Sequence, residues 1–184
     1  AHYYDFNKFF TTPQIKIYRK GNYKNGGEYY LSSENLFGTA VHELAHASHW
    51  EIGYTYGQYV VDAIFSEPFL PESWAQGIES EITSDIYGDS YEKNQSTTIK
   101  DILGNGGYTP IVVDLIDDYN QRAEMYDNAY PIDRVKGYTL KQLEDALYDA
   151  YLWKSWKEKI ESKYPVNPTR IYLNELFENY KNID

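Results

Sequence analysis

Hydrophobic and polar positions first suggest strands in two short stretches near the start of the chain. The stretches "PQIKIYRKG" (13–21) and "GEYYLS" (27–32) contain isoleucines and tyrosines, and Asn25-Gly26 between them is a strong turn signal. We therefore expect a β-hairpin here.

Two helices are expected next. Ser33 is a suitable N-cap for residues 34–52, which contain no proline and end before Gly53, a residue typical of helix C-termini. A second helix is expected over 71–87, because Pro71 suits the first turn of a helix.

The second half of the chain is predicted to be mostly helical. Residues 89–108 are polar and glycine-rich, which is typical of a loop. Thr109 and Pro110 resemble the N-cap and first position of a helix, and Thr139 with Gln142 forms a capping box. The expected helices cover 111–121, 140–164 and 168–180. A short N-terminal sheet followed by helices is an α+β pattern.

Composition excludes several classes of partner and site. The chain has 184 residues, enough for one domain with a real core, and a net charge of −11, which disfavours nucleic acid and anionic membranes as partners. It has no cysteine, so thiolate zinc clusters and disulfides are excluded. No run approaches the roughly 20 apolar residues of a transmembrane helix.

The strongest chemical signal is "HELAH" (42–46), an H-E-x-x-H motif in the first predicted helix. At about 100° per residue, His42 and His46 lie one turn apart on one face, so both imidazoles can bind one zinc ion. Glu43 projects about 100° from His42 and can serve as a general base for a zinc-bound water.

A catalytic zinc site needs a third protein ligand while one position stays open for water. His49 shares the face of His42, but three ligands in one short helix would have difficulty completing a tetrahedron. We therefore expect His49 beside the site and not among the ligands.

The second helix offers several carboxylates for the third position. A helical wheel places Glu81 and Asp85 on the same face as the apolar Ile78, whereas Glu72 and Glu79 lie near the opposite face. A buried carboxylate needs a compensating cation or hydrogen bonds, so the wheel favours Glu81 as the third ligand.

"HELAH" followed by "SEITSDIYG" resembles the gluzincin zinc metallopeptidases, the thermolysin-like group, whose second helix carries N-E-x-x-S-D. The resemblance implies zinc ligands at His42, His46 and Glu81, a general base at Glu43 and an orienting carboxylate at Asp85. It also implies a zincin-like fold, in which a short sheet or hairpin packs on the active-site helix. One catalytic domain would then cover 1–184, with the sheet and both site helices in 1–88 and a mostly helical part in 89–184.

The chain departs from that family in ways that leave alternatives open. Ser80 replaces the asparagine before the glutamate, and no histidine follows His49 to stabilise an oxyanion, so Tyr108 is our candidate for that role. Related gluzincins carry the third ligand in a W-x-x-E-G segment, and "SWAQGIE" is similar with Gln76 at the glutamate position, in which case Glu79 would substitute.

These residues predict a zinc-dependent metallopeptidase that acts on peptide or protein substrates. The alternative is a zincin-like domain that binds zinc in a structural or binding role without turnover. The metalloprotease analogy suggests a secreted or cell-surface location.

A second acidic segment, "DLIDD" (114–118), could suggest calcium. Its carboxylates lack the alternating spacing and the glycine of an EF-hand loop, so we interpret it as a solvated helical face.

Overall fold

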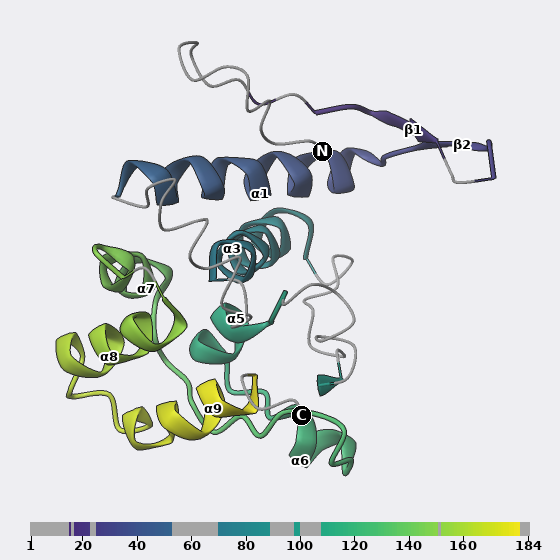
Figure 1. The fold of residues 1–184 in the computed structure, drawn as a ribbon. Coiled ribbons are helices and arrows are strands. Elements are labelled where there is room, and N and C mark those ends of the chain that lie inside the picture. Colours follow the sequence, from purple (N-terminus) through teal and green to yellow (C-terminus); the bar gives the residue numbers. More distant parts are fainter. Residues whose placement is uncertain are drawn as a thin grey trace.

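The fold is α+β, with a two-stranded hairpin followed by a mostly helical body (Figure 1). A computed structural model describes residues 15, 17–22, 25–52, 70–88, 98–99, 108–150 and 152–180. In chain order its elements are β1 (Lys20–Asn22), β2 (Glu28–Tyr30), α1 (Ser33–Glu51), α3 (Leu70–Tyr87), α5 (Ile111–Ile116), α6 (Gln121–Met125), α7 (Leu140–Leu147), α8 (Trp153–Lys163), the 3-10 helix η2 (Arg170–Tyr172) and α9 (Leu173–Asn179).

The predicted hairpin is confirmed, although each strand has only three residues. β1 and β2 are antiparallel, and Gly21 lies opposite Tyr29. The turn between them contains Gly26 at φ +87°, a backbone conformation that favours glycine, and the Asn25 side chain accepts a hydrogen bond from the Gly27 N–H.

The two helices expected in the first half of the chain are also confirmed, with ends that differ little from the prediction. The N-cap of α1 is Ser32, whose hydroxyl accepts a hydrogen bond from the Asn35 N–H at 3.1 Å, and not Ser33. α3 starts at Leu70, one residue before the predicted start. It is followed by Gly88 at φ +70°, a backbone conformation typical of the residue after a helix.

α3 is packed between α1 and α5 (Figure 1). Its contact with α5 depends on Gly77, where an added Cβ would lie 2.2 Å from the Cβ of Val112. The core that includes Val112 also contains the buried indoles of Trp153 and Trp156, and the Trp156 ring contacts that of Trp74 of α3, with centroids 6.5 Å apart. Among the helices of the described ranges, none is both long enough and apolar enough to span a membrane.

Two of the predicted C-terminal helices are interrupted. The helix expected over 111–121 ends at Ile116, and α6 starts anew at Gln121, capped by the Asn120 side chain. Thr109 does not cap α5, because its hydroxyl is hydrogen-bonded to that of Ser73 on α3.

The single helix expected over 140–164 is wrong, because α7 ends at Leu147 and a separate helix, α8, starts at Trp153. Asp149 takes a left-handed conformation with φ +56° at this break. The turn folds α8 back on α7, so that the Trp156 N–H donates to the carbonyl of Leu143 at 3.1 Å. The Thr139–Gln142 capping box at the start of α7 is confirmed.

Candidate metal centre

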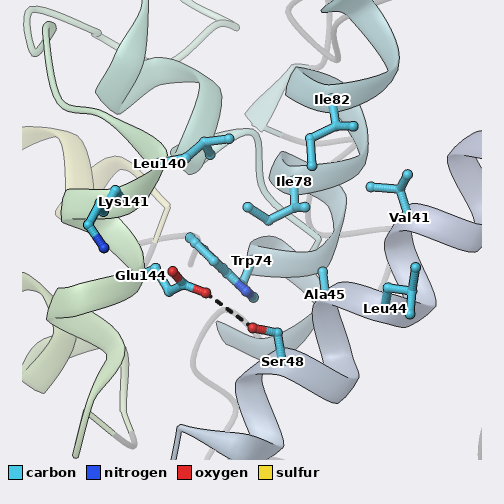
Figure 2. Close-up of a pocket in the computed structure, with 10 residues that line it drawn as sticks. All are labelled: Val41, Leu44, Ala45, Ser48, Trp74, Ile78, Ile82, Leu140, Lys141 and Glu144. Atoms are coloured by element: carbon cyan, nitrogen blue, oxygen red, sulfur yellow. Dashed lines mark hydrogen bonds between the residues drawn. The ribbon is translucent and has the colours of Figure 1, made fainter. Parts of the chain in front are cut away.

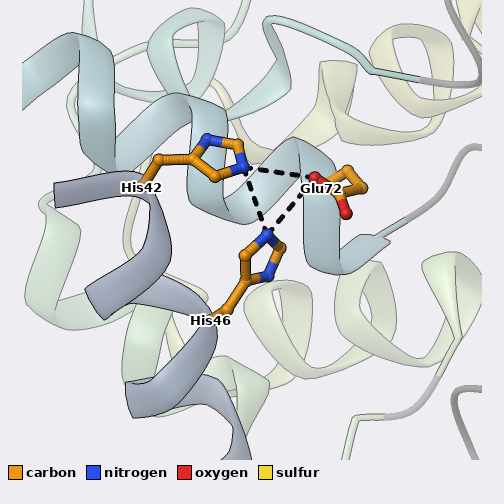
Figure 3. A group of neighbouring side chains, drawn as sticks. All are labelled: His42, His46 and Glu72. Carbon is orange, nitrogen blue, oxygen red and sulfur yellow. Dashed lines mark hydrogen bonds and ion pairs between the residues drawn. The ribbon is translucent and has the colours of Figure 1, made fainter. Parts of the chain in front are cut away.

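His42 and His46 on α1 converge with Glu72 from the first turn of α3 (Figure 3). The two Nε2 atoms are 3.1 Å apart. Glu72 Oε2 lies 3.2 Å from His42 Nε2 and 3.3 Å from His46 Nε2. Within the described part of the chain, this is the only group of three such side chains with ligand atoms within 4.8 Å of one another.

The size of this triangle fits a tetrahedral zinc ion. Zinc binds nitrogen and carboxylate oxygen at about 2.0–2.2 Å, so two ligand atoms of a tetrahedral site are roughly 3.3 Å apart. The three observed separations, 3.1, 3.2 and 3.3 Å, are close to that value. The side chains could therefore form one face of a zinc coordination tetrahedron without a change of backbone.

A second carboxylate orients His42. Glu79 Oε2 lies 3.1 Å from His42 Nδ1, on the opposite edge of the ring from Glu72. Because an ionised carboxylate only accepts hydrogen bonds, Glu79 favours the proton on Nδ1 and leaves the Nε2 lone pair directed at the triangle. This is the arrangement that commonly supports a metal-binding histidine.

The electrostatics of the triangle favour positive charge. Burial by itself lowers the pKa of His42, but hydrogen bonds and charge interactions with Glu72 and Glu79 outweigh burial and raise that pKa to about 9. Burial likewise acts to raise the pKa of Glu72, but hydrogen bonds with His42 and His46 hold it well below its usual range. Protons supply the positive charge in the metal-free chain, and a divalent cation could replace them.

Tyr108 is held next to the triangle. Its ring stacks on that of His42, with centroids 6.5 Å apart, and its hydroxyl donates a hydrogen bond to Glu72. The next residue, Thr109, is anchored to α3: its backbone N–H donates to Ser73 Oγ at 3.1 Å, and the two hydroxyls are 3.0 Å apart. Both of these residues are fully buried, so Tyr108 is positioned by a rigid contact with α3.

Glu43 and His49 are buried on the same helix as the two histidine ligands. Glu43 is 6% exposed, and its Oε2 has no hydrogen-bond partner among the residues that the structure describes. His49 is 2% exposed, and burial together with the charge of His46 lowers its pKa to about 3, so its imidazole is neutral. His49 lies outside the triangle, as expected.

The two carboxylates that we expected at the metal are not part of this arrangement. The triangle contains Glu72 where the sequence favoured Glu81, and the carboxylate hydrogen-bonded to His42 Nδ1 is Glu79 and not Asp85. Glu81 follows Glu72 by nine positions (81 − 72), which on a helix is two and a half turns and places the two side chains about 180° apart. Asp85 is exposed.

An open groove accounts for the apolar face that suggested Glu81. The groove has a volume of about 430 Å³ and lies between α1, α3 and α7 (Figure 2). Ile78 and Ile82 of α3 point into it, so the apolar face of α3 does not point toward α5. Val41, Leu44, Ala45 and Ser48 form its α1 wall, and their mean direction lies roughly 130° around the helix from that of the two histidine ligands. The groove is therefore on a different side of α1 from the triangle.

The face of α3 that packs on α5 is marked by small residues. Ser73, Gly77 and Ser80 are buried and lie on one face of the helix, and Gly77 makes the close approach to Val112. With this face against α5, a polar stripe that includes Glu72 and Glu79 is directed at α1. The small-residue spacing was the signal in the sequence that could have identified Glu72.

Comparisons with protein-family models, with curated proteins and with solved structures found no match for this chain.

Proposed function

We propose that this chain is a zinc-dependent metallopeptidase with a zincin-like fold, whose ligands are His42, His46 and Glu72. The observation that carries the proposal is the triangle of ligand atoms, with sides of 3.1–3.3 Å, built on an H-E-x-x-H helix. A hairpin that leads directly into this helix, as the gluzincin resemblance implies, supports it as well.

Three protein ligands are the number found in catalytic zinc sites, where the fourth position is left for water. When bound at such a site, zinc polarises a substrate carbonyl and makes the bound water acidic near neutral pH. Among the described residues, no further His, Asp or Glu supplies a ligand atom to the triangle. This donor set therefore favours catalysis over a closed structural site.

The remaining side chains have roles that follow from their positions. Glu43 Oε2 is buried next to His42 in sequence and uncommitted among the described residues, so it can accept a proton from the attacking water and deliver it to the leaving amine. The Tyr108 hydroxyl has one proton, which Glu72 accepts; with Glu72 bound to zinc, this hydroxyl could donate instead to the oxyanion that develops on the substrate. Glu79 keeps the His42 ring in its ligand orientation.

The test compares the parent with Glu43→Gln, using a mixed peptide library read by mass spectrometry and zinc content measured on the same samples. Loss of the general base should reduce cleavage by about 100-fold or more while zinc is retained. Glu51→Gln is the matched control, because Glu51 is an exposed glutamate at the end of the same helix.

Two outcomes would contradict the proposal. Zinc-loaded Glu43→Gln that cleaves the library as fast as the parent would remove Glu43 from the mechanism. A parent that binds zinc but cleaves no member of the library would favour the alternative, a zincin-like domain with a binding or structural role.

A further inference from the structure

A second polar cluster is buried far from the triangle in sequence, in the C-terminal half of the chain. Asp114 of α5 is 0% exposed, Gln121 at the start of α6 is 1% exposed, and Asp133 is 3% exposed. Tyr180, which follows α9, is buried against them. The interpretation of 114–118 as a solvated helical face is therefore wrong for Asp114.

Two buried oxygen atoms of this cluster accept no hydrogen bond from the described residues. Asp114 accepts from the Gln121 amide at 2.9 Å through one oxygen and from the Tyr180 hydroxyl through the other. Asp133 Oδ1 accepts from the Val135 N–H at 3.0 Å. Asp133 Oδ2 and Gln121 Oε1 are buried and have no hydrogen-bond partner among the described residues. While Asp133 is ionised, both atoms only accept, so no hydrogen bond between them can satisfy them.

The described residues give the cluster no compensating positive charge, because among them no lysine or arginine forms an ion pair with Asp114 or Asp133. Burial raises the pKa of Asp114 to about 7, and burial with the charge of Asp114 raises that of Asp133 to about 9. The charge of Asp117 acts on both in the same direction. Two neighbouring carboxylates without a cation are costly to bury.

We propose that Asp114, Asp133 and the amide oxygen of Gln121 bind a calcium ion. A divalent cation matches the two negative charges and uses both of the unpartnered oxygens. One proton would neutralise only one of the two carboxylates.

Calcium fits these donors better than other common divalent ions. All of the candidate metal ligands are oxygen atoms, whereas zinc prefers nitrogen and sulfur ligands, so this site does not favour zinc. Magnesium retains several of its waters, which suits a site this deeply buried poorly, whereas calcium accepts irregular shells of carboxylate, amide and backbone oxygens. Backbone carbonyls and water usually supply the remaining ligands of a calcium site.

The proposed ion would stabilise the C-terminal half of the chain. It would join α5 to α6 and to the segment around Asp133, and through Tyr180 to the end of α9. α5 in turn packs on α3, which carries Glu72. We therefore expect calcium to raise thermal stability without supplying a group to the zinc triangle.

The test measures thermal unfolding of the full chain after EGTA treatment and after addition of millimolar calcium chloride. Saturating calcium should raise the melting temperature of the parent by about 5 °C or more. Asp133→Asn keeps the side-chain volume and the acceptor for Val135 but removes one charge, so it should lose most of this shift. Asp118→Asn is the matched control from the same acidic segment, because Asp118 is 81% exposed, and it should respond like the parent.

His46→Ala should also keep the calcium shift, because His46 is not a member of this cluster. A failure of the zinc proposal is thereby distinguished from a failure of the calcium proposal. Calorimetric titration of the parent, which does not depend on the folding of a variant, should show one calcium ion per chain. A parent with an unchanged melting temperature and no bound calcium would overturn the proposal, as would an equal shift in Asp133→Asn.

Discussion

The close contact between α3 and α5 leads to a prediction about Gly77. An alanine Cβ at this position would lie 2.2, 2.6 and 2.7 Å from three side-chain atoms of Val112. Ordinary contacts start at 3.4 Å, so the two helices would have to separate by at least 1.2 Å (3.4 − 2.2). The nearest of these atoms is the Val112 Cβ, which is attached to the backbone and cannot turn away.

Two opposing effects determine the size of the change. Replacing glycine by alanine inside a helix normally stabilises it by about 1 kcal/mol. Overpacking a core typically costs about 1–3 kcal/mol, and more where the neighbour cannot move. Because an added Cβ would lie only 2.2 Å from the Val112 Cβ, we expect a cost near the top of that range. After the gain in helix propensity is subtracted, the free energy of unfolding of Gly77→Ala should be about 2 kcal/mol lower than that of the parent.

Thermal unfolding followed by circular dichroism would measure this effect. A loss of about 2 kcal/mol corresponds to a decrease in melting temperature of about 4–8 °C for a chain of this size. Asp85→Ala, an exposed substitution on the same helix, should stay within about 0.5 kcal/mol of the parent. A Gly77→Ala chain as stable as the parent would refute the close packing of α3 on α5, and with it the orientation that directs Glu72 at α1.

Three further predictions concern the site and its supporting structure. Glu79→Gln should weaken zinc affinity about 10–100-fold in a competition titration with a zinc chelator, because the His42 Nδ1–H loses its charged acceptor at 3.1 Å. Because burial lowers the pKa of His49 to about 3 from 6.5, its contribution to stability is complete above about pH 6.5 and is lost as pH falls toward 3. Denaturant unfolding should therefore show that parent stability falls more steeply than that of His49→Gln over this range. Thr139→Ala should cost about 1 kcal/mol in the same assay, because it removes the capping box of α7.

Each of these has a result that would count against it. Glu79→Gln with the zinc affinity of the parent would mean that another group orients His42. Parallel pH profiles for the parent and His49→Gln would mean that His49 is not protonated preferentially in the unfolded chain. No change in Thr139→Ala would mean that the start of α7 is held by packing alone.

The parts of the fold that the sequence predicted well depend on local signals. The hairpin follows from Asn25-Gly26, α1 from a serine at its start and the absence of internal proline, and α3 from Pro71 in its first turn. The break between α7 and α8 has no glycine or proline to mark it. It is imposed by tertiary packing, because the turn around Asp149 allows Trp156 to bury itself against Leu143.

The candidate site was predictable only where one helix determines it. The spacing of His42 and His46 requires nothing beyond α1, and the structure brings both side chains together. The third position depends on how α3 is rotated against its neighbours. The wheel assumed that apolar residues mark the buried face, whereas Ile82 borders an open groove and the small residue Gly77 makes the closest contact with α5.

We propose that Glu72, and not Glu81, completes the zinc site with His42 and His46. Zinc titration of Glu72→Gln and Glu81→Gln, two matched substitutions on the same helix, distinguishes the two carboxylates. We predict that Glu72→Gln loses at least about 10-fold in zinc affinity, since it removes a charged ligand, while Glu81→Gln binds zinc like the parent. Full zinc binding by Glu72→Gln together with its loss in Glu81→Gln would contradict the account.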